Sequence, residues 1–404
     1  MTFDAVVFDP TQVWLEFPES EQTQAWQQSQ SLSRPSSCWN AYLNQLCLSA
    51  VLSWLREEYA PQATVWPNVA TRFSFWEVVN GTAITLDTTR FVLVPTETID
   101  LSELRVPQEW VDIPNWSADY YLAVQVNPDD RTVRIWGYAT HRQLKTKGTY
   151  ERSDRSYCLA SDDLIQDLNV LWVARQLCPE ETTREAIAPL ASLPPAQVEN
   201  LLQRLGNPAV ITPRLAVPFE LWGALLEHGG WRQRLYERRI GLPEQWSIFQ
   251  WLRAGVSDLA EQVGWGRSGV RQGFERNIPL NKERSEVRLF SMGARGEEST
   301  AQEVILSRQL LIAGQHYELR VLPKSELEEN IWRFELRSST SGLIPGGFKL
   351  RLLTEDLQAF ENNEDVAATA QDQLYIEVSL ALGEGLVWET EPLPENYDRE
   401  ILRF

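Results

Sequence analysis

The sequence is poor in the residues that build metal sites and disulfide scaffolds. It has four cysteines and three histidines among 404 residues, too few for a secreted domain held together by disulfides. Cys38 and Cys47 fall on one predicted helix, about 13.5 Å apart and beyond the reach of a disulfide. No Cys-x-x-Cys or His-x-x-x-His spacing occurs. We therefore expect free thiols in a reducing compartment, with no metal site and no cofactor.

Positive charge and long apolar runs are also scarce. Lys and Arg number 37 against 56 Asp and Glu, a net charge of −19, which disfavours electrostatic binding to nucleic acid or to an acidic membrane surface. The longest apolar run, residues 46–55, contains two serines and covers half a membrane span. No basic segment typical of a secretory signal follows Met1. We expect a folded cytoplasmic protein with no nucleic-acid partner and no membrane insertion.

Charge and pattern divide the chain into regions. Residues 1–180 carry 13 basic and 23 acidic residues, residues 181–280 carry 11 and 10, and residues 281–404 carry 13 and 23. The predicted secondary structure changes at similar places. The division predicted from both is an α+β domain over 1–180, a helical Trp/Arg-rich region over 181–263, a linker over 264–284 and a β-sandwich-like domain over 285–404.

Helices in the N-terminal domain are predicted from apolar residues at three- and four-residue steps. The clearest helix covers residues 38–59, and its apolar face includes Trp39 and Trp54. An amphipathic helix near residues 19–31 precedes it. A helix over residues 162–178 closes the domain, because Asp162 and Asp163 suit the positive end of a helix. Core packing explains the two tryptophans without a ligand.

Strands in the same domain are predicted from alternating apolar residues. They cover residues 73–79, 83–86, 91–95, 120–126 and 132–138. Asn80-Gly81 is a strong hairpin signal between the first two. No helix is predicted between these strands, so we expect an antiparallel, meandering sheet.

The remaining regions differ in class. Proline and glycine positions predict four helices in the middle region, over residues 196–205, 219–227, 231–239 and 248–263. Short apolar runs separated by turns are typical of an all-β sandwich. In the C-terminal region they cover residues 304–312, 317–322, 331–336, 348–353, 374–380 and 386–388.

Two basic clusters are candidates for partner binding. Arg142, Lys145 and Lys147 form the densest basic stretch of this acidic chain. They predict either a solvated loop or a docking patch for an acidic partner. The second cluster combines three arginines with two aromatic residues, which suits cation–π contacts. It consists of Trp231, Arg232, Arg234, Tyr236 and Arg238. It predicts either a protein interface or a seam with an acidic neighbouring domain of the same chain.

Ser37-Cys38-Trp39 resembles a nucleophile at a helix start, where the helix dipole lowers the pKa of a thiol. His141 could serve as its base. Against a peptidase, no Cys-Gly-x-Cys pattern is present and no orienting Asn stands out near His141. The structural alternative is a cysteine half covered at the entry of a helix.

The 17 tryptophans also suggest aromatic platforms for sugars. However, ten of them fall in residues 1–180, and the C-terminal region holds two, Trp332 and Trp388. Packing in a core accounts for an aromatic-rich helical domain equally well.

Several segments together resemble the cyanobacterial domain-of-unknown-function family 1822. They are residues 39–46 (WNAYLNQL), 106–110 (VPQEW), 123–126 (AVQV), 136–138 (WGY), 213–219 (PRLAVPF), 222–223 (WG) and 231–233 (WRQ). The likeness covers most of the chain and is strongest over residues 1–260. These are structural motifs. The resemblance implies a lineage and a cytosolic location, and it supplies no reaction and no active site.

The expected function is that of a non-catalytic cytosolic regulatory or scaffolding protein that binds a protein partner. No convergent catalytic set is visible, while arginine–aromatic clusters accompany acidic outer domains. One alternative is a hydrolase of the cysteine-peptidase type that uses Cys38 and His141. Another is a carbohydrate-binding module.

Overall fold

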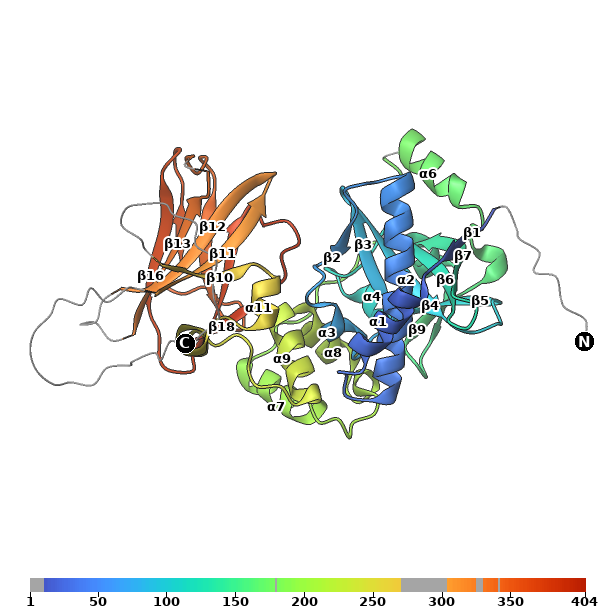
Figure 1. Cartoon of the computed structure of the whole chain (residues 1–404), viewed down its shortest axis with the longest axis horizontal. Coiled ribbons are helices and arrows are strands. Elements are labelled where there is room, and N and C mark those ends of the chain that lie inside the picture. The colour runs from blue at the N-terminus through green and yellow to red at the C-terminus, as the bar shows by residue number, and fades with distance from the viewer. Residues whose placement is uncertain (1–10, 179, 270–303, 325–329, 341) are drawn as a thin grey trace, which may run out of the picture. The chain divides into compact units, whose positions relative to one another are not determined.

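The computed structural model describes residues 11–178, 180–269, 304–324, 330–340 and 342–404. The chain forms two compact units, residues 1–243 and 244–404 (Figure 1). The helices predicted for one middle region are thus shared between the units. In the described part of the chain, no helix is both long enough and apolar enough to span a membrane.

A mixed six-stranded sheet forms the centre of the first unit. Its strands lie in the order β1-β7-β6-β4-β3-β2. They are β1 (Val13–Glu16), β2 (Thr64–Trp66), β3 (Thr82–Leu86), β4 (Thr89–Thr96), β6 (Tyr120–Asn127) and β7 (Thr132–Thr140). A smaller sheet has the order β5-β9-β8. It consists of β5 (Glu103–Pro107), β8 (Thr149–Glu151) and β9 (Ser156–Ala160).

The prediction of an antiparallel meander is wrong at one pair of strands. β4 and β6 are parallel, whereas their other neighbours in this sheet are antiparallel. Parallel strands require a crossover connection, and residues 97–119 supply it with β5 and the short helix α4 (Gln108–Asp112). A helix of five residues leaves no periodic pattern in the sequence, so the crossover was not predictable from periodicity.

Residues 73–79, predicted as a strand, begin inside helix α3 (Arg72–Trp76). The Phe75 ring packs there, with its centroid 5.8 Å from that of Trp110 and 4.6 Å from that of Trp116. The alternating apolar residues therefore reflect an aromatic cluster around a short helix.

The predicted hairpin at Asn80-Gly81 is wrong for the same reason, because a helix and not a strand precedes it. Gly81 adopts a φ of +116° between α3 and β3. A Cβ atom at this position would lie 2.6 Å from Nε1 of Trp110. Glycine is needed here for a close approach of the backbone to an indole ring.

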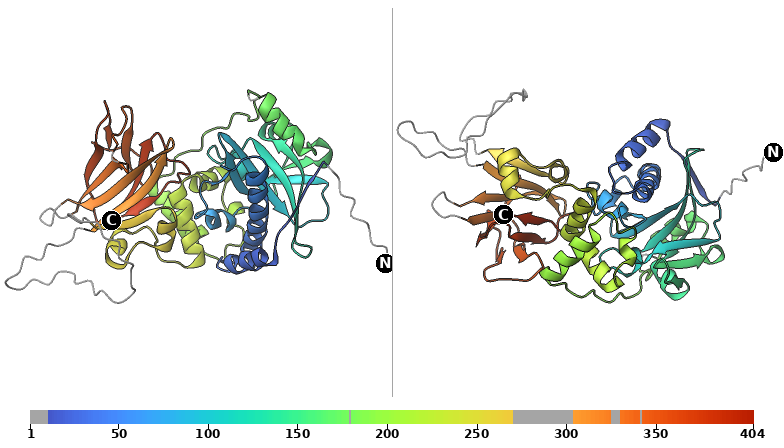
Figure 2. Two further views of the ribbon diagram at one scale, coloured as in Figure 1. Left: turned by 45° about the horizontal axis from the view of Figure 1, so that its top comes forward. Right: turned by 90° about the horizontal axis from the view of Figure 1, so that it is seen from below.

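Helix α2 (Pro35–Glu58) covers one face of the sheet together with α1 (Glu19–Ser29), as Figures 1 and 2 show. Its contact face consists of aliphatic residues such as Leu46 and Val51, which are fully buried. Trp39 is 37% exposed, and Trp54 is half-buried. The helix is confirmed, but the placement of its tryptophans in the core is wrong.

Short helices complete the first unit. They are α5 (His141–Thr146), α6 (Leu168–Leu177), α7 (Pro195–Leu205), α8 (Phe219–Glu227) and α9 (Gly229–Ile240), with 3₁₀ turns at Ser161–Asp163 and Pro213–Leu215. The helix predicted over residues 162–178 begins only at Leu168, where the Asp167 side chain caps it by accepting from the Asn169 amide.

The second unit contains two antiparallel sheets. One has the order β10-β11-β12-β13-β16, with bounds Trp265–Gly269, Val304–Ile312, Gln315–Pro323, Ile331–Ser338 and Gln373–Ser379. The other has the order β15-β14-β17-β18, with bounds Glu364–Val366, Lys349–Thr354, Gly385–Glu391 and Ile401–Arg403. Side chains from both sheets form one hydrophobic core.

Two helices of this unit replace the single one predicted over residues 248–263. They are α10 (Ile248–Ala254) and α11 (Asp258–Gln262). Gly255, with a φ of +103°, ends α10. Trp246 and Trp251 belong to the same core as the sheets.

Part of the predicted linker over residues 264–284 is a strand. Residues 265–269 form β10, which pairs with β11. Trp265 is buried, and its indole N–H donates to the Glu400 carboxylate at 2.8 Å. Arg308 forms an ion pair with the same carboxylate at 3.0 Å. Residues 270–284 lie outside the described residues.

We expect residues 244–404 to fold alone and residues 281–404 to fail. The shorter fragment lacks β10 and the buried tryptophans at positions 246, 251 and 265. Glu400 would lose a hydrogen-bond partner inside a depleted core. Thermal unfolding followed by circular dichroism compares the two fragments. Equal cooperative melts would show that these N-terminal residues do not belong to the unit.

Candidate functional site

The aromatic–arginine cluster of α9 lies inside the first unit. Arg232 is 2% exposed, and its guanidinium donates to the Leu226 carbonyl at 3.0 Å and to the Ser74 hydroxyl at 3.1 Å. It also lies 4.0 Å from the ring centroid of Phe75. Trp231 is buried and stacks on His228. These two predicted partner-binding residues are not accessible to a partner.

The neighbouring Arg239 forms a buried ion pair with Glu77. Its Nε lies 2.7 Å from Oε1 of Glu77, and both side chains are buried. Glu77 also accepts hydrogen bonds from the amide and the hydroxyl of Ser33. Arg239 in addition donates to the Leu205 carbonyl at the end of α7. Four separate segments of the chain therefore meet at one carboxylate and one guanidinium.

Arg234 and Arg238 face α7. Both pair with Glu199, at 3.0 Å and 2.6 Å. Burial raises the pKa of Glu199, but the hydrogen bonds and charges of the two arginines outweigh it and hold that pKa below its usual range. Tyr236, on the same helix, is half-buried, and burial raises its pKa to about 12. Of the two readings of this cluster, the geometry supports the seam within the chain.

A second buried ion pair, between Arg214 and Glu109, was not predicted from the sequence. Arg214 makes two hydrogen bonds to the carboxylate of Glu109, at 2.9 Å and 2.6 Å. The indole N–H of Trp222 donates to the same carboxylate at 2.7 Å. Glu109 is fully buried in α4, and Trp222 lies on α8. No local pattern marks these residues, which are more than 100 positions apart.

Only part of the basic stretch on and just after α5 is available to bind a partner. Lys145 binds Asp112 at 2.8 Å and the Tyr157 hydroxyl at 2.9 Å. Arg142 is exposed and pairs with Glu185 at 3.0 Å, and Lys147 is exposed. Lys145 therefore stabilises the fold, whereas Arg142 and Lys147 are exposed at the surface.

Cys38 and His141 have separate environments. The Cys38 thiol contacts the Leu32 carbonyl at 3.7 Å, and burial together with the charge of Glu77 raises its pKa. His141 is fully buried. Its Nδ1 accepts from the Glu185 amide at 3.0 Å, which leaves Nε2 to donate to the Val111 carbonyl at 2.9 Å. Both ring nitrogens of His141 are hydrogen-bonded to backbone groups, so neither is available to take a proton from a thiol. The raised pKa of Cys38 also disfavours the thiolate that a cysteine nucleophile needs. This geometry gives the hydrolase alternative no support.

The sugar-binding alternative also lacks support in the C-terminal region. Trp332 and Trp388, the tryptophans of the C-terminal region, are both buried, so neither offers an exposed platform for a sugar. Within the described ranges, no three His, Cys, Asp or Glu side chains are grouped to hold a metal ion.

Helix α6 carries an apolar surface that the sequence analysis did not single out. Its inner face is anchored by buried Leu168 and Leu171. Its outer face presents Val170, Val173 and Leu177, which are 47%, 52% and 72% exposed. The spacing i, i+3, i+7 places these three side chains in one stripe along the helix. A surface helix normally has polar residues in this position.

Trp172, on a different side of α6 from this stripe, connects the helix to aromatic rings at the end of α2. Trp172 stacks on Tyr59 with ring centroids 4.1 Å apart, and Trp54 lies 6.3 Å from Trp172. Tyr59 is 44% exposed. We call the set Tyr59, Val170, Trp172, Val173 and Leu177 the α6 surface.

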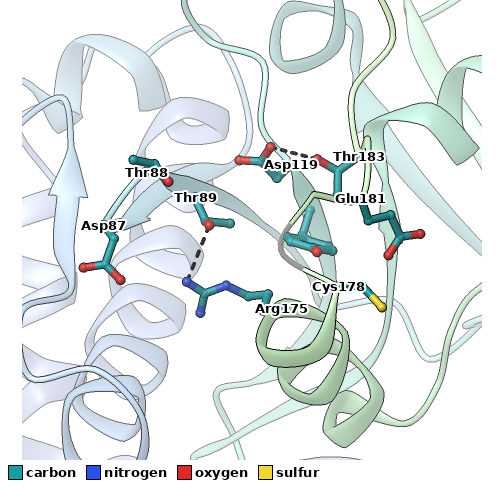
Figure 3. Close-up of a pocket in the computed structure, with 9 residues that line it drawn as sticks. Asp87, Thr88, Thr89, Asp119, Arg175, Cys178, Glu181 and Thr183 are labelled. Carbon is teal, nitrogen blue, oxygen red and sulfur yellow. Dashed lines mark hydrogen bonds between the residues drawn. The ribbon is translucent and has the colours of Figure 1, made fainter.

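A polar pocket of about 310 Å³ lies beside the inner side of α6 (Figure 3). Arg175 donates to the Thr89 hydroxyl at 3.4 Å, and the Thr183 hydroxyl donates to Asp119 at 2.9 Å. Burial raises the pKa of Asp119, but hydrogen bonds and the charge of Arg184 hold it below its usual range. Much of the polar lining is thus already engaged within the chain.

The chain consists of one unit with helices around a mixed sheet and a second unit with two antiparallel sheets. Inside the first unit, the ion pairs of Arg214 and Arg239 connect segments that are distant in sequence. The chain belongs to the family described as protein of unknown function (DUF1822), whose model matches residues 15–403. No curated protein and no solved structure matches the chain. The resemblance seen in the sequence is thereby confirmed at the level of family.

His141 should make stability depend on pH. Burial lowers its pKa below the ordinary value near 6.5. The unfolded chain then binds a proton more readily than the folded chain, so this contribution is complete above about pH 6.5 and declines as the pH falls below it. We expect His141→Gln to remove that part of the decline.

Urea unfolding of both proteins at pH 7.5 and pH 5.5 measures the effect. The difference between the two pH values should be smaller in the variant than in the wild type. An identical loss of stability in the two proteins would contradict this role of His141.

Proposed function

We propose that the protein is a non-catalytic, cytoplasmic regulatory or scaffolding protein that binds a protein partner through the α6 surface. The observation that carries this proposal is the outer stripe of α6, where Val170, Val173 and Leu177 are exposed on one face. Exposed contiguous apolar side chains on a folded protein mark interaction sites. A partner that covered them would gain the hydrophobic free energy that the isolated unit forgoes.

The aromatic part of the surface supports recognition of a protein. Tyr59 and Trp172 are rigid, and each combines a large apolar ring with a polar group. Residues of these types supply much of the binding energy at protein interfaces when they lie at the centre of a contact. They lie on a different side of α6 from the aliphatic stripe, so we expect the stripe to carry the contact and the two rings to add to it at the edge.

Charge around the α6 surface favours a partner with basic residues at its edge. Glu57, Glu58, Asp163 and Glu180 are exposed near the ends of α2 and α6. Complementary charges would steer the encounter and set the orientation of the partner. The proposed partner therefore presents apolar residues bordered by Lys or Arg. Arg142 and Lys147, the exposed residues of the first basic cluster, would contact acidic groups elsewhere on the partner.

The second unit fits a scaffolding role. Its two antiparallel sheets share one core, and we assign it to the β-sandwich class. Such a rigid unit can present loops or sheet faces to a further protein. This assignment is part of the proposal.

The test compares two charge substitutions in the first unit. Val173→Glu places a carboxylate in the centre of the apolar stripe. Gln203→Glu places the same charge at an exposed position of α7, which carries none of the α6 surface. Both sites are exposed, so each substitution should change the free energy of unfolding by about 0.5 kcal/mol or less. Affinity purification with quantitative mass spectrometry compares wild type and both variants.

We expect a partner with a basic surface to be retained by wild type and Gln203→Glu and lost by Val173→Glu. Binding should weaken as salt rises. A partner that is retained equally by all three proteins would contradict docking on α6. Recovery of no partner by the wild type would count against the proposed function as a whole.

A further inference from the structure

A second pocket of the first unit, away from the α6 surface, contains buried polar groups without a hydrogen-bond partner. Its volume is about 370 Å³, within the range of small-molecule sites. Strands β4, β6 and β7 of the large sheet contribute Val94, Ala123 and Trp136 to its wall. The loop before β5, β5 itself and the chain around Asp154 complete it.

Trp136 reaches this wall because of an irregularity in the sheet. Ala123 pairs with Gly137 and Val124 pairs with Ile135, so Trp136 has no partner residue on β6. One extra residue in a strand is a β-bulge, and bulges redirect side chains next to functional sites. A regular register would have given Trp136 a cross-strand neighbour.

The indole N–H of Trp136 is a hydrogen-bond donor without a partner in the part of the chain that the structure describes. The residue is 4% exposed, and its Nε1–H has no hydrogen-bond partner among the described residues. Oδ1 of Asp154 is likewise a buried acceptor without a hydrogen bond in the described structure. Buried polar atoms are nearly always satisfied by protein, water or ligand. Trp136 and Asp154 both line the pocket, so a ligand that carries both acceptors and donors would suit their two unpaired atoms.

The charged residues of the pocket exclude an anionic ligand. Arg214 is occupied by Glu109, and Arg105 pairs with Glu103 at 2.5 Å and with Asp154 at 2.8 Å. No lining cation is therefore left for a phosphate or a carboxylate. A cationic ligand would compete with Arg105 for Glu103 and Asp154. The third lining carboxylate, Asp100, accepts from the Ser102 amide at 3.0 Å.

We propose that this pocket binds a small neutral polyhydroxy compound of about monosaccharide size. Each hydroxyl group both accepts and donates, so a compound with several of them can accept from the Trp136 N–H and donate to the Asp154 oxygen. The hydroxyls of Thr96, Ser102 and Ser156 add further polar contacts along the wall. Val94, Ala123 and Leu104 provide apolar surface for the carbon skeleton. The site does not depend on the α6 surface.

The test uses isothermal titration of the full-length protein with glucose, galactose, myo-inositol and glycerol. Glucose 6-phosphate serves as the charged match of glucose, and putrescine as a cationic probe. We expect at least one neutral compound to bind, and glucose 6-phosphate and putrescine to bind more weakly or not at all. Trp136→Phe keeps a ring but removes the N–H, and it should weaken binding about fivefold.

Trp26→Phe is the matched control, because Trp26 is exposed on α1 and does not line the pocket. It should bind as the wild type does. Asp154→Asn, which keeps a similar shape, gives a second readout if Trp136→Phe fails to fold. Absence of binding by every neutral compound would overturn the proposal, as would tighter binding of glucose 6-phosphate or putrescine. Neutral binding that neither pocket variant weakens would place the ligand elsewhere and overturn it too.

Discussion

The buried ion pair between Glu77 and Arg239 is the interaction on which the arrangement of the first unit depends. It joins the segment after α3 to α9, and through Ser33 and the Leu205 carbonyl it also reaches the start of α2 and the end of α7. Burying two charges is costly, and the cost is offset only when the geometry is good and the remaining polar atoms are bonded. Loss of either partner would leave the other charge buried and uncompensated.

The pair between Glu109 and Arg214 repeats this arrangement between α4 and the 3₁₀ turn before α8, with Trp222 of α8 as an additional donor. Helices α7–α9 are therefore attached to the sheet-bearing part of the unit by charges as well as by apolar contacts. This explains why a group of arginines and aromatic residues that suggested an interface is largely interior. The surface that we propose for a partner is the apolar outer face of α6.

Local patterns predicted much of the secondary structure. The helices over residues 196–205 and 219–227 follow from proline, glycine and apolar spacing, and so do strands β11, β12, β13, β14, β16 and β17 of the C-terminal region. The short strands β15 and β18 were not predicted. The sequence could not predict that β4 and β6 are parallel, because that pairing depends on the crossover between them. Residues 73–79 mimic a strand because aromatic residues alternate there, although their contacts to Trp110 and Trp116 are made from a helix.

The candidate sites were harder to predict than the fold. Val170, Val173 and Leu177 have the composition of a core helix, and only their exposure distinguishes a docking face from a buried one. The position of Trp136 in the pocket wall depends on the register between β6 and β7, which cannot be predicted from the sequence of either strand alone. The partners of Arg232 and Arg239 are far away in sequence, so their burial could not be inferred from neighbouring residues.

A double-mutant cycle on Glu77 and Arg239 tests the central claim most directly. Unfolding in urea gives the stability of Arg239→Met, of Glu77→Gln and of the double variant. Arg238→Met, which removes the more exposed pair with Glu199, is the control and should cost less than about 1 kcal/mol. We predict that Arg239→Met costs about 3–5 kcal/mol and that the double variant loses clearly less than the sum of the single losses. Small, additive losses at both positions would contradict the account.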